Sequence, residues 1–224
     1  MNKLFTECFY FSKSNFGPIF KLFGLYVIIS SLLNPFVEYL SLNSNLNWGT
    51  LTYQVMLGLI YTYLMIKFIQ FMASTVTGDS VQSRFSWNQW WRLLLVYIFY
   101  GLAVMVGFIA LILPGIYLAA KYAFADFEVV LNDKPVLSAL HESWNDTKGI
   151  TGRLMSVTTV IAVFQFAIGF IIGAVGELSS VMYFITDIVG GIVSSSVMVF
   201  TSVVYFRLYT ESRVIENDSV ENNL

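Results

Sequence analysis

Long apolar runs separated by short polar stretches dominate this chain. A helix needs about 20 mostly apolar residues to cross a hydrocarbon core about 30 Å thick. Five runs meet that requirement, at residues 17–36, 51–73, 91–113, 154–175 and 184–208. A sixth run, 115–131, is shorter and carries Lys121, Asp126 and Glu128. The pattern predicts an all-α membrane protein with six transmembrane helices.

The distribution of positive charge favours six crossings over five. If the N-terminus is cytoplasmic and six segments cross, every one of the 12 lysines and arginines except Lys121 falls on the cytoplasmic side. The outer connections, 34–50 and 176–183, contain neither lysine nor arginine. Cytoplasmic loops carry an excess of these residues. We therefore expect both termini in the cytoplasm, a single transmembrane domain over residues 1–213, and a disordered, polar and acidic tail over 214–224.

A short motif occurs twice in the chain, first from Glu7 and again from Glu142. At the same spacing Phe9, Ser12, Lys13 and Gly17 align with Trp144, Thr147, Lys148 and Gly152. Each copy precedes a span that begins on the cytoplasmic side, and a looser copy at 84–87 precedes the third span. We therefore expect three parallel hairpin units, each preceded by a cytoplasmic amphipathic segment.

The segment 135–149 illustrates the amphipathic pattern. Apolar residues recur at helical spacing on one face, at Val136, Leu137, Leu140 and Trp144, and polar residues take the other, at His141, Glu142, Asn145 and Asp146. Such a helix lies in the headgroup layer with Trp144 as its anchor, or packs on the bundle as an ordinary connection. Both interpretations stay open.

Composition narrows the class of protein further. Hydrophobic residues make up 57% and charged residues 12%, against about 25% charged in a soluble domain, and the mean hydropathy is +0.70. The net charge of −2 leaves no basic excess for binding nucleic acid. Cys8 is the only cysteine of the sequence, which excludes a disulfide within the chain. His141 is the only histidine, which excludes a zinc site of the HExxH type. We expect no catalytic residues, no metal site and no cofactor.

The most distinctive stretch lies between residues 111 and 153. It combines Pro114-Gly115, an apolar segment, the turn Asn132-Asp133-Lys134, and a helix with Ala139, Leu140, Ser143, Trp144, Lys148 and Gly149. With the ending 203–213, this pattern resembles the YciC-like family of bacterial inner-membrane proteins. It is also similar to the membrane domain that some glycerophosphodiester phosphodiesterases carry beside their catalytic domain. The resemblance implies a bacterial inner-membrane location but no phosphodiesterase activity, since that catalytic domain is missing. Where the family often has Ala-Pro, this chain has Ala125-Asp126.

Three groups of residues are candidates for function. Lys121, Asp126 and Glu128 form a polar cluster inside a predicted span, where charges are costly and either pair with nearby charges or serve a polar pathway. The candidate contacts to lipid headgroups are Arg84, Arg92, Trp144, Lys148 and Arg153. Gly169 and Gly173 form a small-residue face for helix packing, within the chain or in a homodimer.

These patterns lead to three hypotheses about function. The first is a non-enzymatic inner-membrane protein that acts in envelope homeostasis through membrane lipids or other inner-membrane proteins. The second is a small permease or exporter with a polar pathway at the fourth span. The third, an enzyme acting on lipids, is the weakest, because neither a nucleophile–base triad nor an acidic metal cluster can be assembled on one side.

Overall fold

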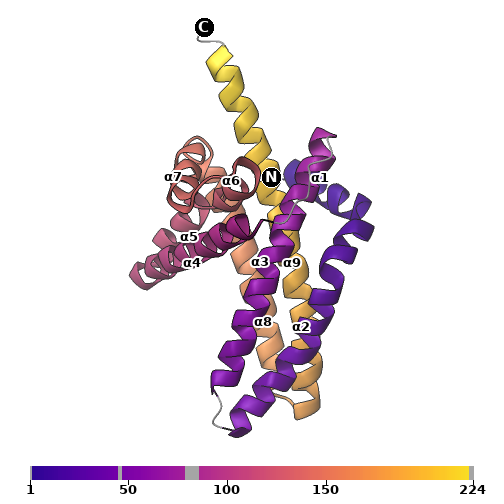
Figure 1. Ribbon diagram of the computed structural model, residues 1–224. Helices are drawn as coiled ribbons and strands as arrows, with labels where there is room; N and C mark the ends of the chain where they lie inside the picture. Colours follow the sequence, from indigo (N-terminus) through magenta and orange to yellow (C-terminus); the bar gives the residue numbers. More distant parts are fainter. Residues whose placement is uncertain (1, 45–46, 79–85, 222–224) are drawn as a thin grey trace. The chain divides into compact units, whose positions relative to one another are not determined.

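The computed structural model describes residues 2–44, 47–78 and 86–221, and within them every regular element is a helix. In chain order (Figure 1) the helices are α1 (Asn2–Ser14), α2 (Phe16–Ser44), α3 (Asn47–Thr77), α4 (Trp87–Ala110), α5 (Ile112–Lys121), α6 (Ala125–Asn132), α7 (Val136–Asp146), α8 (Thr151–Gly176) and α9 (Ser180–Glu221).

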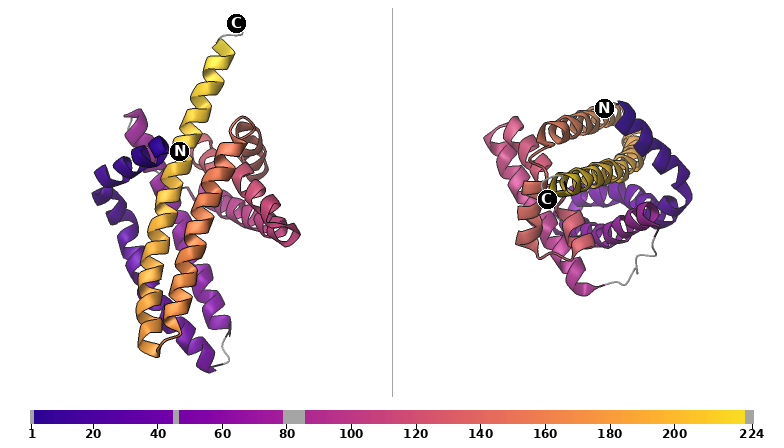
Figure 2. Two further views of the ribbon diagram at one scale, coloured as in Figure 1. Left: turned by 180° about the vertical axis from the view of Figure 1, so that it is seen from behind. Right: turned by 90° about the horizontal axis from the view of Figure 1, so that it is seen from above.

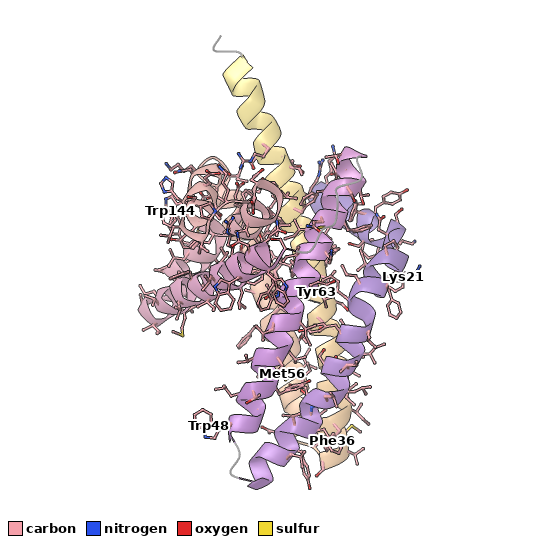
Figure 3. All side chains as sticks on the ribbon, in the orientation of Figure 1. Lys21, Phe36, Trp48, Met56, Tyr63 and Trp144 are labelled. Atoms are coloured by element: carbon pink, nitrogen blue, oxygen red, sulfur yellow. The ribbon has the colours of Figure 1, made fainter. Side chains whose placement is uncertain are left out.

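Five of these helices, α2, α3, α4, α8 and α9, are long and apolar enough to cross a membrane. They coincide with the five long apolar runs of the sequence. Large apolar side chains point outward from them, as Phe36, Trp48 and Met56 do in Figure 3, with exposed fractions of 59%, 76% and 57%. Such apolar surfaces are suited to contact with the lipid tails of a bilayer. The prediction of an all-helical membrane protein is confirmed.

The predicted fourth span is not a single helix. Residues 115–131 are divided between α5 and α6, which the turn Tyr122–Phe124 separates. At 1.5 Å per residue the two helices measure about 15 Å and about 12 Å, so neither crosses a hydrocarbon core of about 30 Å alone. The six-span, three-hairpin arrangement is therefore not confirmed. The break directly precedes Ala125-Asp126, where the resembling family often has a proline.

The chain divides into two compact units. Unit 1 comprises Met1–Cys8, Ile66–Val160 and Ser202–Leu224, and unit 2 comprises Phe9–Met65 and Ile161–Thr201. Unit 2 is a bundle of α2 with parts of α3, α8 and α9, which run alongside one another in Figure 2. The single domain expected over residues 1–213 stays a prediction.

In unit 1, α4 and α5 form a tight antiparallel hairpin (Figure 1). The chain reverses at Leu111, which is extended, and not at Pro114-Gly115, which lies inside α5. Farther along, the Gln89 side-chain amide donates to the Val130 carbonyl (2.9 Å) and the Arg92 guanidinium donates to the Asp133 carbonyl (2.9 Å). The α5–α6 arm therefore returns the chain to the level at which α4 begins.

Gly107 and Gly115 make the close approach within this hairpin. A Cβ atom on Gly107 would lie 2.8 Å from the Cα of Gly115, which is backbone and cannot turn aside. We expect Gly107→Ala to lower the free energy of unfolding by about 1–3 kcal/mol, because the extra carbon forces the helices apart. Gly101 is the matched control on α4, since a Cβ there meets nothing within 4 Å. Gly101→Ala should stabilise the helix by about 0.5–1 kcal/mol. SDS titration of the purified protein measures both, and equal effects would disprove the close approach.

Helices α1 and α7, in which the two copies of the sequence motif begin, bury matching faces. Leu4 and Cys8 are buried on α1, and the residues 135 positions later, Ala139 and Ser143, are buried on α7. This face differs from the predicted apolar face of α7, whose Leu137 is 73% exposed. Small residues are buried because they allow close packing.

Residues 214–224 are predicted to be a disordered tail; the structure continues α9 as a helix to Glu221, and residues 222–224 lie outside the described residues. Neither proline nor glycine occurs between Tyr209 and Glu221, so nothing interrupts the hydrogen-bond ladder.

Candidate functional site: a broken helix and its buried charges

A break in a helix leaves backbone polar groups without helical partners, and α7 supplies those partners here. The Ser143 hydroxyl accepts a hydrogen bond from the Phe124 N–H (3.1 Å) and donates one to the Lys121 carbonyl (2.9 Å). Ser143 has no exposed surface. One side chain thus satisfies a donor and an acceptor on the two sides of the break.

Lys121 ends α5 and is 3% exposed. Its ammonium group donates to the Trp144 carbonyl (3.2 Å) and to the Thr147 hydroxyl (3.4 Å). It also lies 5.3 Å from the ring centroid of Trp144 and 5.9 Å from that of Tyr117, distances at which a cation is attracted to an aromatic face. Lys121 therefore does not extend toward the surface, because polar and aromatic groups of Trp144 and Thr147 stabilise its charge in the interior.

Glu128 on α6 is completely buried and is neutralised by α9. Its carboxylate accepts hydrogen bonds from the Tyr209 hydroxyl (3.0 Å) and the Asn132 amide (2.9 Å), and forms an ion pair with Arg213. Arg213 also contacts the Asp146 carboxylate at the end of α7 (3.1 Å). A buried charge is tolerated when it is paired and its remaining lone pairs are hydrogen-bonded.

The break separates charges that a continuous helix would place on one face. Lys121 contacts α7, whereas Glu128 contacts α9. Glu128 forms its ion pair with Arg213, whereas Lys134 pairs with Glu142 and Arg153 pairs with Glu211. Asp126 is half-buried at the start of α6, where its carboxylate accepts the Phe127 N–H (2.9 Å). The three charges therefore do not form one cluster.

The turn between α6 and α7 is closed by an ion pair. The Lys134 ammonium lies 2.7 Å from the Glu142 carboxylate. This hydrogen bond raises the pKa of Lys134 and lowers the pKa of Glu142. Both groups are charged at neutral pH, and the pair links the middle of α7 to the turn that precedes it.

The candidate headgroup contacts differ in how accessible they are. Arg84 lies outside the described residues. Arg92 bonds to Asp133, and Arg153 donates to the Glu211 carboxylate (2.7 Å). The Trp144 ring is half-buried and packs edge-on against Tyr117. Lys148 is exposed and takes part in neither of these ion pairs. Trp87 and Trp91, at the start of α4, are 73% and 55% exposed.

Close helix packing in the described part of unit 2 does not involve Gly169 and Gly173. A Cβ on Gly169 or Gly173 would meet nothing within 4 Å, so neither makes a close helix contact among the described residues. In unit 2 the close approaches occur at Gly190, whose Cβ would clash with Ile172, and at Gly191, whose Cβ would lie 2.8 Å from the Ser31 hydroxyl. Sequence alone does not reveal which small residues face a neighbour.

Sequence analysis also missed the residues that complete the buried network. These are Ser143, Thr147, Asn132, Tyr209 and Arg213. The available signal was the i, i+4 series Ala139, Ser143 and Thr147, which marks a narrow small-residue face on α7. Nothing local marks Arg213, which lies 85 residues from Glu128.

Among the described residues, no group of three or more His, Cys, Asp or Glu side chains is placed to hold a metal ion. The helices and their outward apolar surfaces define a multi-pass helical membrane protein. No family model, curated protein or solved structure matches this chain. The resemblance to the YciC-like family stays a hypothesis.

Proposed function

We propose that this chain is a non-enzymatic inner-membrane protein that acts through contacts with anionic lipid headgroups and with other membrane proteins. The observation that carries the proposal is that aromatic side chains are exposed at the start of α4 and a lysine is exposed just after α7. These residues are Trp87, Trp91 and Lys148. Exposed indoles and exposed cations are both typical of the headgroup level of a bilayer.

The topology proposed with this function has six passes, with the α5–α6 arm as a broken return pass and both termini cytoplasmic. The hydrogen bonds of Gln89 and Arg92 to the end of the α5–α6 arm support it, because they bring the chain back to the level where α4 starts. Positive charge near the α6–α7 turn also favours a cytoplasmic position there. Together with the resemblance described above, this arrangement favours a bacterial inner membrane.

The alternative function is a small permease or exporter with its polar pathway at the α5–α6 break. Such a pathway would need Lys121 to leave the oxygens that accept its hydrogen bonds, or Glu128 to leave its ion pair with Arg213, at a considerable energetic cost. The internal pairing of both charges therefore favours the lipid-contact proposal.

Lipid binding is tested by native mass spectrometry of the protein released from nanodiscs that contain phosphatidylglycerol. Lys148→Gln should weaken binding of the anionic lipid about fivefold, since one basic residue at an anionic surface contributes about 1 kcal/mol. Arg153→Gln is the charge-matched control, and it should have a smaller effect because Glu211 already engages Arg153. Equal lipid occupancy in Lys148→Gln and the parent would rule out this contact.

The topology is tested with the natural cysteine left in place. Cys8 is 2% exposed, and burial raises its pKa to about 11, so the thiolate that reacts with maleimide is scarce at pH 7. We expect no labelling of the folded parent protein at pH 7, and labelling after denaturation. In this background Glu177→Cys should react with an impermeant maleimide added to intact cells, whereas His141→Cys should react only after lysis. Labelling of His141→Cys from outside would contradict the proposed return pass.

A further inference from the structure

Unit 2 contains a charged residue inside a candidate span that the buried network of unit 1 does not involve. Asp187 lies on α9 seven residues after Ser180, about 10 Å along the helix from its start. The Asn34 amide of α2 donates to the Asp187 carboxylate (3.2 Å), and the Gln54 amide of α3 donates to the Asn34 side-chain oxygen (3.3 Å). Three apolar helices therefore meet at one hydrogen-bonded acidic group.

A buried hydroxyl without a hydrogen-bond partner lies one helical turn away. Ser31 is 3% exposed, and its hydroxyl oxygen has no partner among the described residues. Ser31 precedes Asn34 by three positions on α2, and Gly191 follows Asp187 by four on α9, so each pair shares a helix face. The Ser31 hydroxyl lies 2.8 Å from the position that a Cβ on Gly191 would take. This places the hydroxyl at the α2–α9 contact, next to the Asn34–Asp187 pair.

The α2 backbone contributes a further oxygen at the same level. Pro35 lies inside α2 and has no N–H, so the Ser31 carbonyl does not receive its usual helical hydrogen bond. The Tyr53 hydroxyl donates to the neighbouring Ser30 carbonyl (3.1 Å), which shows that polar side chains reach the backbone here. A carboxylate, a hydroxyl and a carbonyl, all possible oxygen ligands, thus lie within about one helical turn of one another along α2 and α9.

We propose that unit 2 binds a small alkali-metal cation between α2 and α9, through the Asp187 carboxylate and the hydroxyl and carbonyl oxygens of Ser31. Asn34 and Gln54 are positioning residues that orient the carboxylate. One carboxylate among neutral oxygens matches the charge of a monovalent ion, whereas calcium sites usually supply several carboxylates. The site is independent of the lipid-contact proposal.

The test measures thermal unfolding of the full chain in phosphatidylcholine nanodiscs while sodium or potassium chloride replaces choline chloride at constant ionic strength. A ligand that binds the folded state raises the midpoint in proportion to the logarithm of its concentration once it exceeds the Kd. We expect this rise in the parent and in Glu177→Gln, an exposed charge-matched control in unit 2. The rise should be lost in Asp187→Asn and reduced in Ser31→Ala.

Several results would overturn the proposal. One is a parent midpoint that is the same in sodium, potassium and choline, and another is an undiminished rise in folded Asp187→Asn. If Asp187→Asn does not fold, Ser31→Ala decides, because a purely structural hydroxyl would change the midpoint equally in every salt. A shift produced by phosphatidylethanolamine nanodiscs but by neither metal would assign the site to a lipid ammonium and also refute an alkali-metal site. Binding of radioactive sodium to the parent, displaced by unlabelled sodium, should accompany the expected result.

Discussion

Arg213→Met is expected to lower the free energy of unfolding by about 3–5 kcal/mol, among the largest effects of any single substitution in this chain. Arg213 is the cation paired with Glu128, whose side chain has no exposed surface. Removing the guanidinium leaves a buried carboxylate with neutral partners such as Tyr209 and Asn132 but without its cation, and it also removes the cation beside Asp146. The cost arises from the unpaired buried charge and not from the loss of an attractive pair as such.

Two further variants separate this cause from a general loss of packing. In the double variant Glu128→Gln/Arg213→Met the buried group is neutral and can still accept the Tyr209 hydrogen bond, so a large part of the stability should return. Arg207→Met removes an arginine from the same helix whose ion pair with Glu7 is exposed, and it should cost only about 0–1 kcal/mol. SDS titration measures all three. Equal losses for Arg213→Met and Arg207→Met would contradict the buried pairing.

The long helices could be predicted because their signal is local. Each of the five runs contains enough consecutive apolar residues to form a span, and the observed helices α2, α3, α4, α8 and α9 contain the predicted runs almost entirely. The helical segment before α8 was predictable for the same reason. Its packed face was not, because Leu137 is the more hydrophobic residue, yet the smaller Ala139 and Ser143 lie at the contact.

The break between α5 and α6 could not be predicted from local sequence. Residues 119–126 contain neither proline nor glycine, and helix formers such as Ala119, Ala120 and Ala123 favour a continuous helix. What stabilises the break is the Ser143 hydroxyl, which lies about 20 positions later in the chain. The ion pair of Glu128 could not be predicted from local sequence either. Several basic residues lie on the same predicted side of the membrane as Glu128, and the packing of α9 determines that Arg213 is the one that pairs with it.

The unit 2 site was missed for a related reason. Asp187 is a single acidic residue in a long apolar run, so it does not disturb the span prediction, and its neighbours Asn34 and Gln54 come from two other helices. Lone polar residues in separate spans show their shared position only after the helices pack.

Ser143→Ala tests the broken helix directly, and we expect it to lower the free energy of unfolding by about 1–3 kcal/mol. The Phe124 N–H loses the Ser143 oxygen that accepts its hydrogen bond, and a buried group that loses its partner costs about 1–3 kcal/mol, whereas the Lys121 carbonyl still accepts from the Thr147 hydroxyl (3.4 Å). The matched control is Ser156→Ala, because Ser156 is exposed on α8 and its hydroxyl only bonds to the Gly152 carbonyl of its own helix. That change should stay within about 0.5 kcal/mol of the parent. Loosening of the break should also speed hydrogen exchange at the Phe124 amide in Ser143→Ala alone. If Ser143→Ala unfolds at the same SDS concentration as Ser156→Ala, α7 does not hold the break, and the turn between α5 and α6 must be stable by itself.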